Sequence, residues 1–308
     1  MKCRLSGLLL CTLLSNTVYG EIYRWTDEHG KVHFSDTPQA RFEQTTVALK
    51  LPAIDWKPLD IQVTAKDAGI NAKDIQRIQH DVNLVYRFYT QQIYFNVYKT
   101  IPVHITVLSD QESYNQYLLN IIGQQTAPSW GMFIGQRNEI VVFLRDNADL
   151  TFATLKHEVS HAIVHSIAPN TPAWLNEGIA EQMENLLDQN GRLVLLRHNE
   201  NHRVVRYLHQ RNQLKPLQQL LDLQSTQWRH QTTQSNGALQ AVAGELVYFL
   251  LANVPGRSFV KQLLHEYKRG SALKSLYLID KHYVMGVDGL QVKWQQYLNE
   301  NNTPSVHF

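Results

Sequence analysis

The chain has 308 residues, of which 44% are hydrophobic and 18% are charged, and it contains 15 Gly and 10 Pro. This composition is typical of a globular protein and excludes collagen-like, low-complexity and wholly disordered chains. Lys and Arg (29 residues) nearly balance Asp and Glu (27 residues), so the charge gives no indication of a nucleic acid or a membrane surface as partner.

Residues 1–20 have the layout of a secretory signal peptide. A short basic region precedes the mostly apolar stretch Leu5–Leu14, which is too short for a stable membrane anchor, and Gly20 is a small residue at the expected cleavage site. No apolar run reaches the roughly 18 uncharged residues of a membrane-spanning helix, so we expect no transmembrane segment.

The two cysteines of the chain, Cys3 and Cys11, both lie in this leader. Cleavage would therefore leave a mature protein without disulfides or thiolate chemistry. Lipidation at Cys11 is the alternative to cleavage after residue 20, but the bulky Leu10 stands where a lipoprotein signal has a small residue.

Residues 21–37 read EIYRWTDEHGKVHFSDT and predict a β-hairpin. Aromatic and β-branched residues in Ile22–Trp25 and Lys31–Phe34 flank a turn that contains Gly30. An isolated two-stranded hairpin is only marginally stable in water, so we expect this one to dock on another element or to gain further strands.

The same segment closely resembles a small bacterial envelope-associated domain family of unknown function. The resemblance rests on IYRWTD (22–27), Gly30 and VHFSDTP (32–38). Members of this family typically follow a signal peptide. The resemblance therefore implies a bacterial protein exported to the periplasm or the extracellular space, with cell-envelope tethering through this module, but it implies no biochemical activity.

The predicted organisation is a signal peptide (1–20), a small β module with a linker (21–58) and a larger α+β domain (59–308). In the larger domain, helical spacing of apolar residues covers 71–89, and 103–108 is a strand followed by a helix to about Leu119. Two strands that form a hairpin follow at 131–134 and 140–144. The rest is mostly helical, over 150–166, 172–187, 202–211, 239–253, 257–268 and 287–299. We expect no βαβ alternation.

The first motif that indicates chemistry is HEVSH, residues 157–161. Residues four apart lie on one helix face with Cβ atoms about 5–6 Å apart, so the imidazoles of His157 and His161 can bind one zinc ion. Glu158 lies roughly 100° further round the helix and flanks the metal. Alone, the pattern also fits a solvated helix face, because the chain has 14 His.

The second motif is WLNEGIAE, residues 174–181. Glu177 follows His161 at a distance that allows one loop and an antiparallel helix to complete a His, His, Glu set, which leaves one zinc position open. Gly178 costs a helix about 1 kcal/mol relative to Ala. We expect close packing against the helix of His157 and His161 to require it; the alternative for the segment is a surface helix.

Residues 149–187 therefore resemble the gluzincin metallopeptidases, specifically the peptidase MA-like group, in which His-Glu-x-x-His is paired with a downstream Trp-Leu-Asn-Glu-Gly-x-Ala-Glu helix. The resemblance implies a zincin-like fold with a small sheet, an active-site helix and a helical C-terminal part. It implies one zinc ion per chain, held by His157, His161 and Glu177, with Glu158 as the catalytic acid and base.

The resemblance also implies two supporting roles. Glu181, one turn past the third ligand, stands where related enzymes orient a ligand histidine, although a solvated helix carboxylate is its alternative. The strand at 140–144 would form the upper edge of the cleft and pair with extended substrate.

The oxyanion donor stays unassigned in the sequence. Related proteins often carry a Tyr on a later helix, where a loose match places Gln240, with Tyr248 two turns further on. A Gln amide can donate a hydrogen bond but has no phenolic proton. His202, Tyr207 and His209 are further candidates, each with an ordinary packing or surface role as the alternative.

The sequence thus predicts zinc-dependent hydrolysis of peptide bonds in an unknown protein or peptide substrate, with Glu158 activating a water molecule. The alternative is a non-catalytic binding or scaffold protein of the envelope with a structural or vestigial metal site. Glu158 favours the enzyme, because a structural site has no use for an acid that does not bind the metal. A third possibility combines a tethering module with a peptidase that trims wall-associated protein.

Overall fold

The computed structural model describes residues 22–26, 28, 30, 32–35, 43–47, 56–66, 69–100, 103–300 and 305–308. The predicted signal peptide lies outside these ranges. The chain divides into two units, residues 1–55 and residues 56–308.

The first unit contains a three-stranded antiparallel sheet of order β2-β1-β3. Its strands are β1 (Ile22–Thr26), β2 (Val32–Ser35) and β3 (Gln44–Val47). Trp25 in β1 pairs with His33 in β2 and with Gln44 in β3. The predicted hairpin is confirmed, and it gains its third strand from a segment whose sequence predicts linker or extended chain.

The main sheet of the second unit has the order β4-β5-β7-β6. Its strands are β4 (Gln62–Lys66), β5 (His104–Leu108), β6 (Gly131–Ile134) and β7 (Glu139–Phe143). β4, β5 and β7 are parallel, and β6 runs antiparallel to β7 at the edge. α1 (Ala72–Gln91) connects β4 to β5, and α2 (Gln111–Ile122) lies in the connection from β5 to β7.

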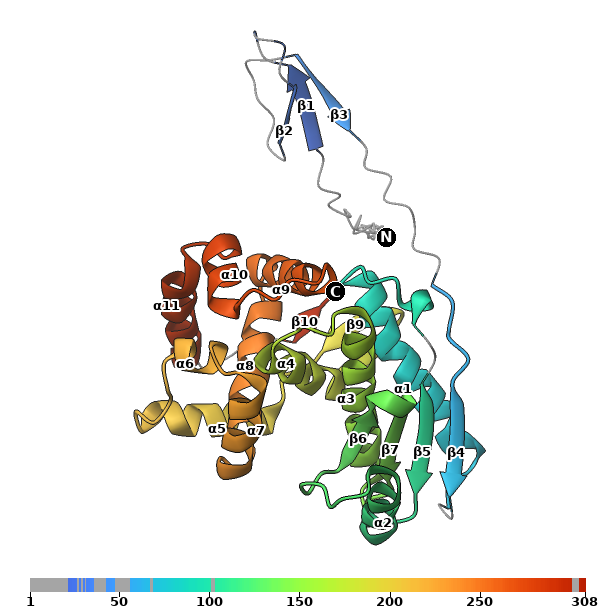
Figure 1. Ribbon diagram of the computed structural model, residues 1–308. Coiled ribbons are helices and arrows are strands. Elements are labelled where there is room, and N and C mark those ends of the chain that lie inside the picture. Colours follow the sequence, from blue (N-terminus) through green and yellow to red (C-terminus); the bar gives the residue numbers. More distant parts are fainter. Residues whose placement is uncertain are drawn as a thin grey trace, which may run out of the picture. The chain divides into compact units, whose positions relative to one another are not determined.

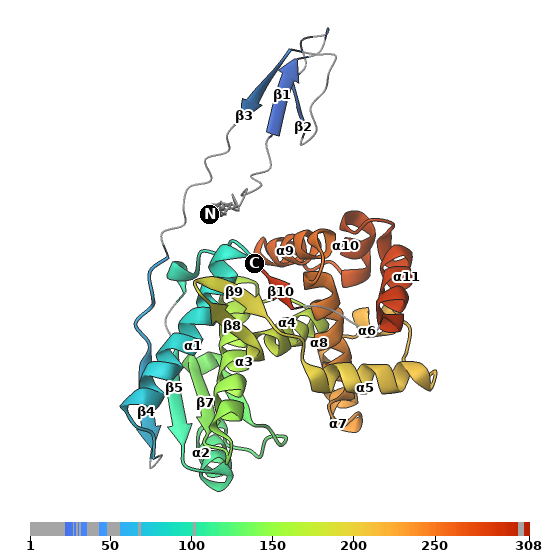
Figure 2. The same cartoon turned by 180° about the vertical axis from the view of Figure 1, so that it is seen from behind.

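The expectation of no βαβ alternation is therefore wrong. The missed strand is β4, which is short and mostly exposed, so its sequence lacks the apolar pattern that identifies a buried parallel strand. The α+β class itself is confirmed, because helices dominate the remainder of the unit around small sheets (Figures 1 and 2).

Helices cover both faces of the main sheet. The face that carries Val141 and Phe143 packs against Tyr114 and Leu118 of α2. The opposite face, with Ile140 and Val142, joins the larger core that contains α1 and α3 (Ala148–Ile167). The alternation along β7 explains why all five of its residues are buried.

The helical part follows α3 along the chain. Its helices are α4 (Ala173–Glu184), α5 (Asn199–Gln210), α6 (Leu217–Leu221), α7 (Ser225–Gln234), α8 (Ala238–Leu251), α9 (Val254–Lys268), α10 (Ser275–His282) and α11 (Gly286–Asn299). α8 passes through the middle of this part beside α4, α5 and α9 (Figures 1 and 2). Two short 3-10 helices are η1 (Val97–Lys99) and η2 (Gly135–Arg137).

A small second sheet interrupts the helices. Its strands are β8 (Leu186–Gln189), β9 (Arg192–Leu195) and β10 (Val306–His307). The helix expected over 172–187 ends at Glu184, because the residues that follow form the hairpin of β8 and β9. Asn190 and Gly191, with positive φ values of 54° and 81°, form the turn of this hairpin. An Asn-Gly pair is a strong hairpin signal that the helical interpretation overlooked.

Within the described ranges, no single helix has both the length and the apolarity to cross a bilayer; by length and composition alone, only the pair α8–α9, bent by 116°, meets the criteria.

Candidate metal centre

α3 presents its two histidines on the side opposite its buried face. Asn147 caps the helix by accepting a hydrogen bond from the Asp149 N–H, and Leu155 and Val159 are fully buried against the core. His157 and His161 are half-buried, and their rings lie 4.8 Å apart between centroids at 81° to each other. The expected i, i+4 pairing of the two imidazoles is therefore present in the structure.

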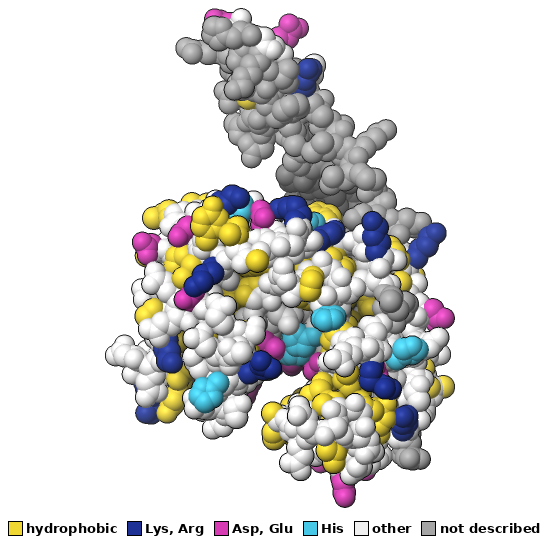
Figure 3. All heavy atoms as spheres, in the orientation of Figure 1, with side chains coloured by type: hydrophobic (Ala, Val, Ile, Leu, Met, Phe, Trp, Pro, Cys, Tyr) yellow, Lys and Arg dark blue, Asp and Glu magenta, His cyan; other side chains and the backbone are white. Residues whose placement is uncertain are grey.

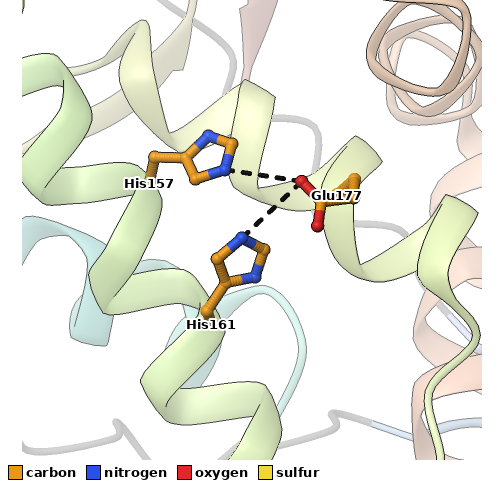
Figure 4. A group of neighbouring side chains, drawn as sticks. All are labelled: His157, His161 and Glu177. Atoms are coloured by element: carbon orange, nitrogen blue, oxygen red, sulfur yellow. Dashed lines mark ion pairs between the residues drawn. The ribbon is translucent and has the colours of Figure 1, made fainter. Parts of the chain in front are cut away.

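α4 brings the third side chain of the group. Its first turn is anchored by the buried Trp174, whose indole Nε1–H donates to Ser275 Oγ at 2.9 Å. Glu177 follows less than one turn later and points toward α3 (Figure 4). The anchoring of a large aromatic side chain fixes the rotation of α4 and so the direction of Glu177.

Gly178 serves a different contact from the one that its sequence position suggests. A Cβ atom at this position would lie 2.5 Å from Val247 Cγ2 and 2.6 Å from the Ala243 carbonyl oxygen, both on α8. The close neighbour is therefore α8 and not the histidine helix α3. Because glycine lets α8 approach α4, α4 is held between α3 and α8.

The three side chains converge on one point (Figure 4). Glu177 Oε2 lies 3.6 Å from His157 Nε2 and 3.7 Å from His161 Nε2. Ligand atoms at about 2.0–2.1 Å from a tetrahedral zinc ion stand roughly 3.3 Å apart. Two imidazole nitrogens and a carboxylate oxygen at these distances fit a zinc ion with little movement.

Glu158 lies beside this group and contacts the edge of the main sheet. The side chain is 8% exposed, and its Oε2 accepts a hydrogen bond from the Phe133 N–H of β6 at 2.8 Å. Gly131 makes this approach possible, since a Cβ atom there would lie 2.7 Å from Thr154 Cγ2 and 3.2 Å from Glu158 Cγ. β6 therefore runs directly over the helix turn that carries Glu158.

The strand expected to form the upper edge of the cleft, 140–144, does not lie at an edge. It corresponds to β7, which is buried between β5 and β6. The edge strand is β6, the other member of the predicted hairpin. Two adjacent apolar strands cannot be ranked as inner and outer from sequence, because both alternate in the same way.

A carboxylate does hold one of the two candidate ligand histidines, but it is Glu184. Its Oε1 lies 2.9 Å from His157 Nδ1, and its Oε2 lies 3.4 Å from His198 Nε2. Glu181, expected in this role, instead accepts a hydrogen bond from Asn201 Nδ2 at 2.7 Å. Glu184 is seven residues after Glu177 and so shares its helix face, but Glu181 lies on the same face, so spacing alone does not separate the two.

The acids of this cluster differ in their ionisation. Burial alone would raise the pKa of Glu184, but hydrogen bonds with His157 and His198 lower it to about 2. Burial likewise opposes ionisation of Glu177, whereas His161 and His157 bring its pKa below the usual value. Burial and the nearby Glu184 raise the pKa of Glu181. Glu177 and Glu184 are therefore the carboxylates of this cluster whose ionised form the neighbouring histidines favour.

On the helical side, His202 is held by a buried carboxylate. Its Nδ1 lies 2.8 Å from Glu245 Oε1, which also accepts the Tyr297 hydroxyl at 2.5 Å. Glu245 is 1% exposed and directly follows Gly244 of α8, where a Cβ atom would lie 3.1 Å from Glu181 Cβ. Glu245 is therefore next in sequence to a residue that contacts α4. His202, which it holds, lies one turn along α5 from His198.

The other oxyanion candidates differ in position. Tyr248 is 1% exposed, and burial raises the pKa of its hydroxyl to about 12. Gln240 is half-buried, and its Oε1 has no hydrogen-bond partner among the described residues. Tyr207 is 53% exposed, and His209 bonds Asn299 at the surface. Among the described residues, no hydrogen bond or ion pair joins Gln240, Tyr207 or His209 to the three candidate ligands.

The surface of the second unit has a hollow. On the face seen in Figure 3, histidine and acidic side chains gather in it between the part of the second unit that carries β6 and the part that carries α5 and α7. Imidazole nitrogens and carboxylate oxygens are both donor atoms that zinc accepts.

Comparison with known families identifies one region of the chain. Residues 9–53 match a family described as a domain of unknown function (DUF4124). This match confirms that the N-terminal part carries a small domain of unknown function, as its sequence indicated. Comparison with curated proteins finds no match for the chain.

Proposed function

We propose that residues 56–308 form a zinc-dependent peptidase of the gluzincin type with a zincin-like fold. The observation that carries the proposal is the convergence of His157, His161 and Glu177 on one point. The acid Glu158 directly follows His157 on α3. A metal site that only supports a fold is closed by its ligands and has no need of an additional buried acid beside it.

The residues have separate tasks in this proposal. His157, His161 and Glu177 would hold a zinc ion, which would supply Lewis acidity and lower the pKa of a bound water to about 7. Glu158 takes the proton of the attacking water and returns it to the leaving amine. Glu184 accepts the Nδ1–H of His157 and so directs the Nε2 lone pair toward the ligand position.

His202 is the best-supported oxyanion donor of the candidates. Glu245 holds its Nδ1, so the Nε2 atom of the ring is the one that can face a substrate. An imidazolium ring carries a proton on each nitrogen, so it can bond the carboxylate and donate from Nε2 to a developing negative charge at the same time. Glu245, which holds the ring, follows Gly244 on α8, and a Cβ atom at Gly244 would lie 3.1 Å from Glu181 Cβ on α4.

The substrate would bind as an extended strand along β6. β6 is an edge strand, and main-chain hydrogen bonds to a sheet edge are a common way to bind an extended peptide. Because the Phe133 N–H on this edge contacts Glu158, a peptide paired there would pass directly in front of the proposed acid and base.

Cleavage of an unbiased peptide library by the wild type and by Glu158→Gln tests the proposal. The substitution keeps the size of the side chain and its acceptor for the Phe133 N–H but removes the base. We expect one zinc per chain in both proteins and at least a 100-fold loss of hydrolysis in the variant. Glu112→Gln, on the exposed first turn of α2, is the matched control and should cleave like the wild type.

Equal cleavage by the wild type and Glu158→Gln, both loaded with zinc, would contradict the mechanism. Zinc binding without cleavage in either protein would favour the alternative, a scaffold protein of the envelope with a structural metal site.

The proposed location is outside the cytoplasm, through export by residues 1–20. N-terminal sequencing of protein recovered from a bacterial periplasm should then begin at Glu21. Recovery of the intact N-terminus from the cytoplasm would contradict export.

A further inference from the structure

A pocket of about 570 Å³ lies in the helical part of the second unit, lined by residues from α5 to α8. None of the residues that line it belongs to the metal cluster. Its volume is within the range of small-molecule sites, about 300–1,000 Å³. The pocket is therefore a candidate ligand site separate from the metal cluster.

The walls of the pocket are apolar and only partly covered. Leu208, Leu214 and Leu239 are half-buried, while Val242 forms part of the floor. These side chains come from α5, from the loop before α6 and from α8. Apolar side chains left partly in water around a concave site favour an apolar ligand.

Among the described residues that line the pocket, the one with a permanent charge is Lys215. Lys215 and His230 line it together with four glutamines, and no Asp or Glu is among the described residues that do so. Lys215 has no ion pair with the described residues, so its ammonium group is available to a ligand. This distribution is complementary to an anionic group at one end of an apolar ligand.

The backbone around the pocket disfavours a peptide. Most of the lining residues belong to helices, whose N–H and C=O groups are already paired within the helix, so no strand edge is offered for main-chain hydrogen bonds. A ligand that needs no main-chain hydrogen bonds, with one polar end and a long apolar chain, fits these walls better.

We infer that this pocket binds a single-chain anionic amphiphile, with a long-chain carboxylic acid as the simplest member of the class. The alkyl chain lies against the leucines and Val242, and the carboxylate meets Lys215 and the glutamine amides. The inference does not depend on the metal centre or on peptidase activity.

The test measures binding of decanoate, dodecanoate and tetradecanoate to the purified full chain by calorimetry, below the concentration at which each acid forms micelles. We expect affinity to rise about fourfold for each added methylene until the pocket is filled. Tetradecanol, which lacks the charge, should bind about tenfold more weakly than tetradecanoate.

Variants locate the binding. Leu239→Trp fills the pocket and should abolish binding, whereas Leu276→Trp, at a half-buried leucine on α10 outside the pocket, should bind like the wild type. Lys215→Gln should lower the affinity for the acid to that for the alcohol, and Lys293→Gln should not change it. If Leu239→Trp does not fold, Leu214→Asp places a carboxylate in the wall and should also abolish binding of the acid.

Three results would overturn the inference. They are absence of binding for all three acids, undiminished binding by the folded pocket variants, and equal affinity for tetradecanoate and tetradecanol. The last would leave an apolar site without preference for an anion.

Discussion

Glu139 at the start of β7 and Glu177 on α4 are both carboxylates withdrawn from water, but their neighbours differ in kind. Glu139 is 6% exposed, and its two oxygens accept hydrogen bonds of 2.7–2.8 Å from Thr106, Tyr117 and Arg137. Glu177 instead faces two imidazole nitrogens at 3.6 and 3.7 Å, which is longer than a hydrogen bond.

The difference separates a structural acid from a candidate ligand. Around Glu139, hydroxyl and guanidinium donors satisfy the carboxylate and balance its charge, so nothing further is needed. Around Glu177, the nearest groups are imidazole nitrogens, which can themselves bind a metal, and they are spaced so that an ion fits among them. The kind of donor and its distance, and not burial alone, distinguish the two sites.

The largest expected difference between Glu177 and Glu139 is in zinc binding. Glu177→Ala should abolish zinc binding, as should His157→Ala and His161→Ala, because each removes one of three protein ligands. Glu139→Ala should retain one zinc per chain. Metal analysis after dialysis measures both, and full zinc occupancy in the Glu177 or histidine variants would show that the ligands are assigned wrongly.

The next effect tests whether a further buried acid, Glu245, supports a group that acts on the substrate. His202→Ala should lower kcat by about 10²–10³-fold while zinc content and KM change little, as expected for loss of an oxyanion donor. His209→Ala on the same helix is the control and should leave kcat unchanged. An unaffected kcat in His202→Ala would return the role to Gln240.

A smaller effect distinguishes the two acids that follow Glu177 on α4. Glu184→Gln should weaken zinc affinity by roughly 10–100-fold, because the carboxylate orients His157. Glu181→Gln, which faces Asn201, should change affinity less. Competition with a zinc chelator measures both, and the reverse order would restore to Glu181 the role that its sequence position implied.

The last expected effect concerns Glu139 and is a change in the free energy of unfolding. Burial would raise the pKa of Glu139, but hydrogen bonds from Thr106, Arg137 and Tyr117 bring it below the usual value of 4.5. Glu139→Gln should therefore cost about 1–3 kcal/mol at neutral pH with zinc binding intact.

The pH dependence of that loss follows from the sign of the shift. A lowered pKa in the folded state stabilises the fold above the unfolded value, and this contribution disappears as the pH falls through the folded value. Denaturant unfolding of the wild type and Glu139→Gln should therefore converge in acid. A difference that persists at the lowest pH would mean that the substitution acts through packing.

The sequence by itself determined which three side chains converge in the candidate site. The i, i+4 spacing of His157 and His161 follows from helix geometry alone, and the α3 and α4 segments both carry the sequence pattern of helices. The N-terminal hairpin was equally accessible, because its turn and strand residues are local signals. Patterns that depend only on neighbours along the chain can be interpreted from the amino-acid sequence without knowledge of the packing.

Tertiary structure alone decided which neighbours these segments meet. Gly178 packs against α8, Glu184 takes the place at His157, and β6 forms the sheet edge beside Glu158. Each of these contacts joins residues whose sequence separation carries no periodic signal, or chooses between residues on one helix face. Helix spacing defines a face, but only the packing of α3, α4, α5 and α8 defines what that face touches.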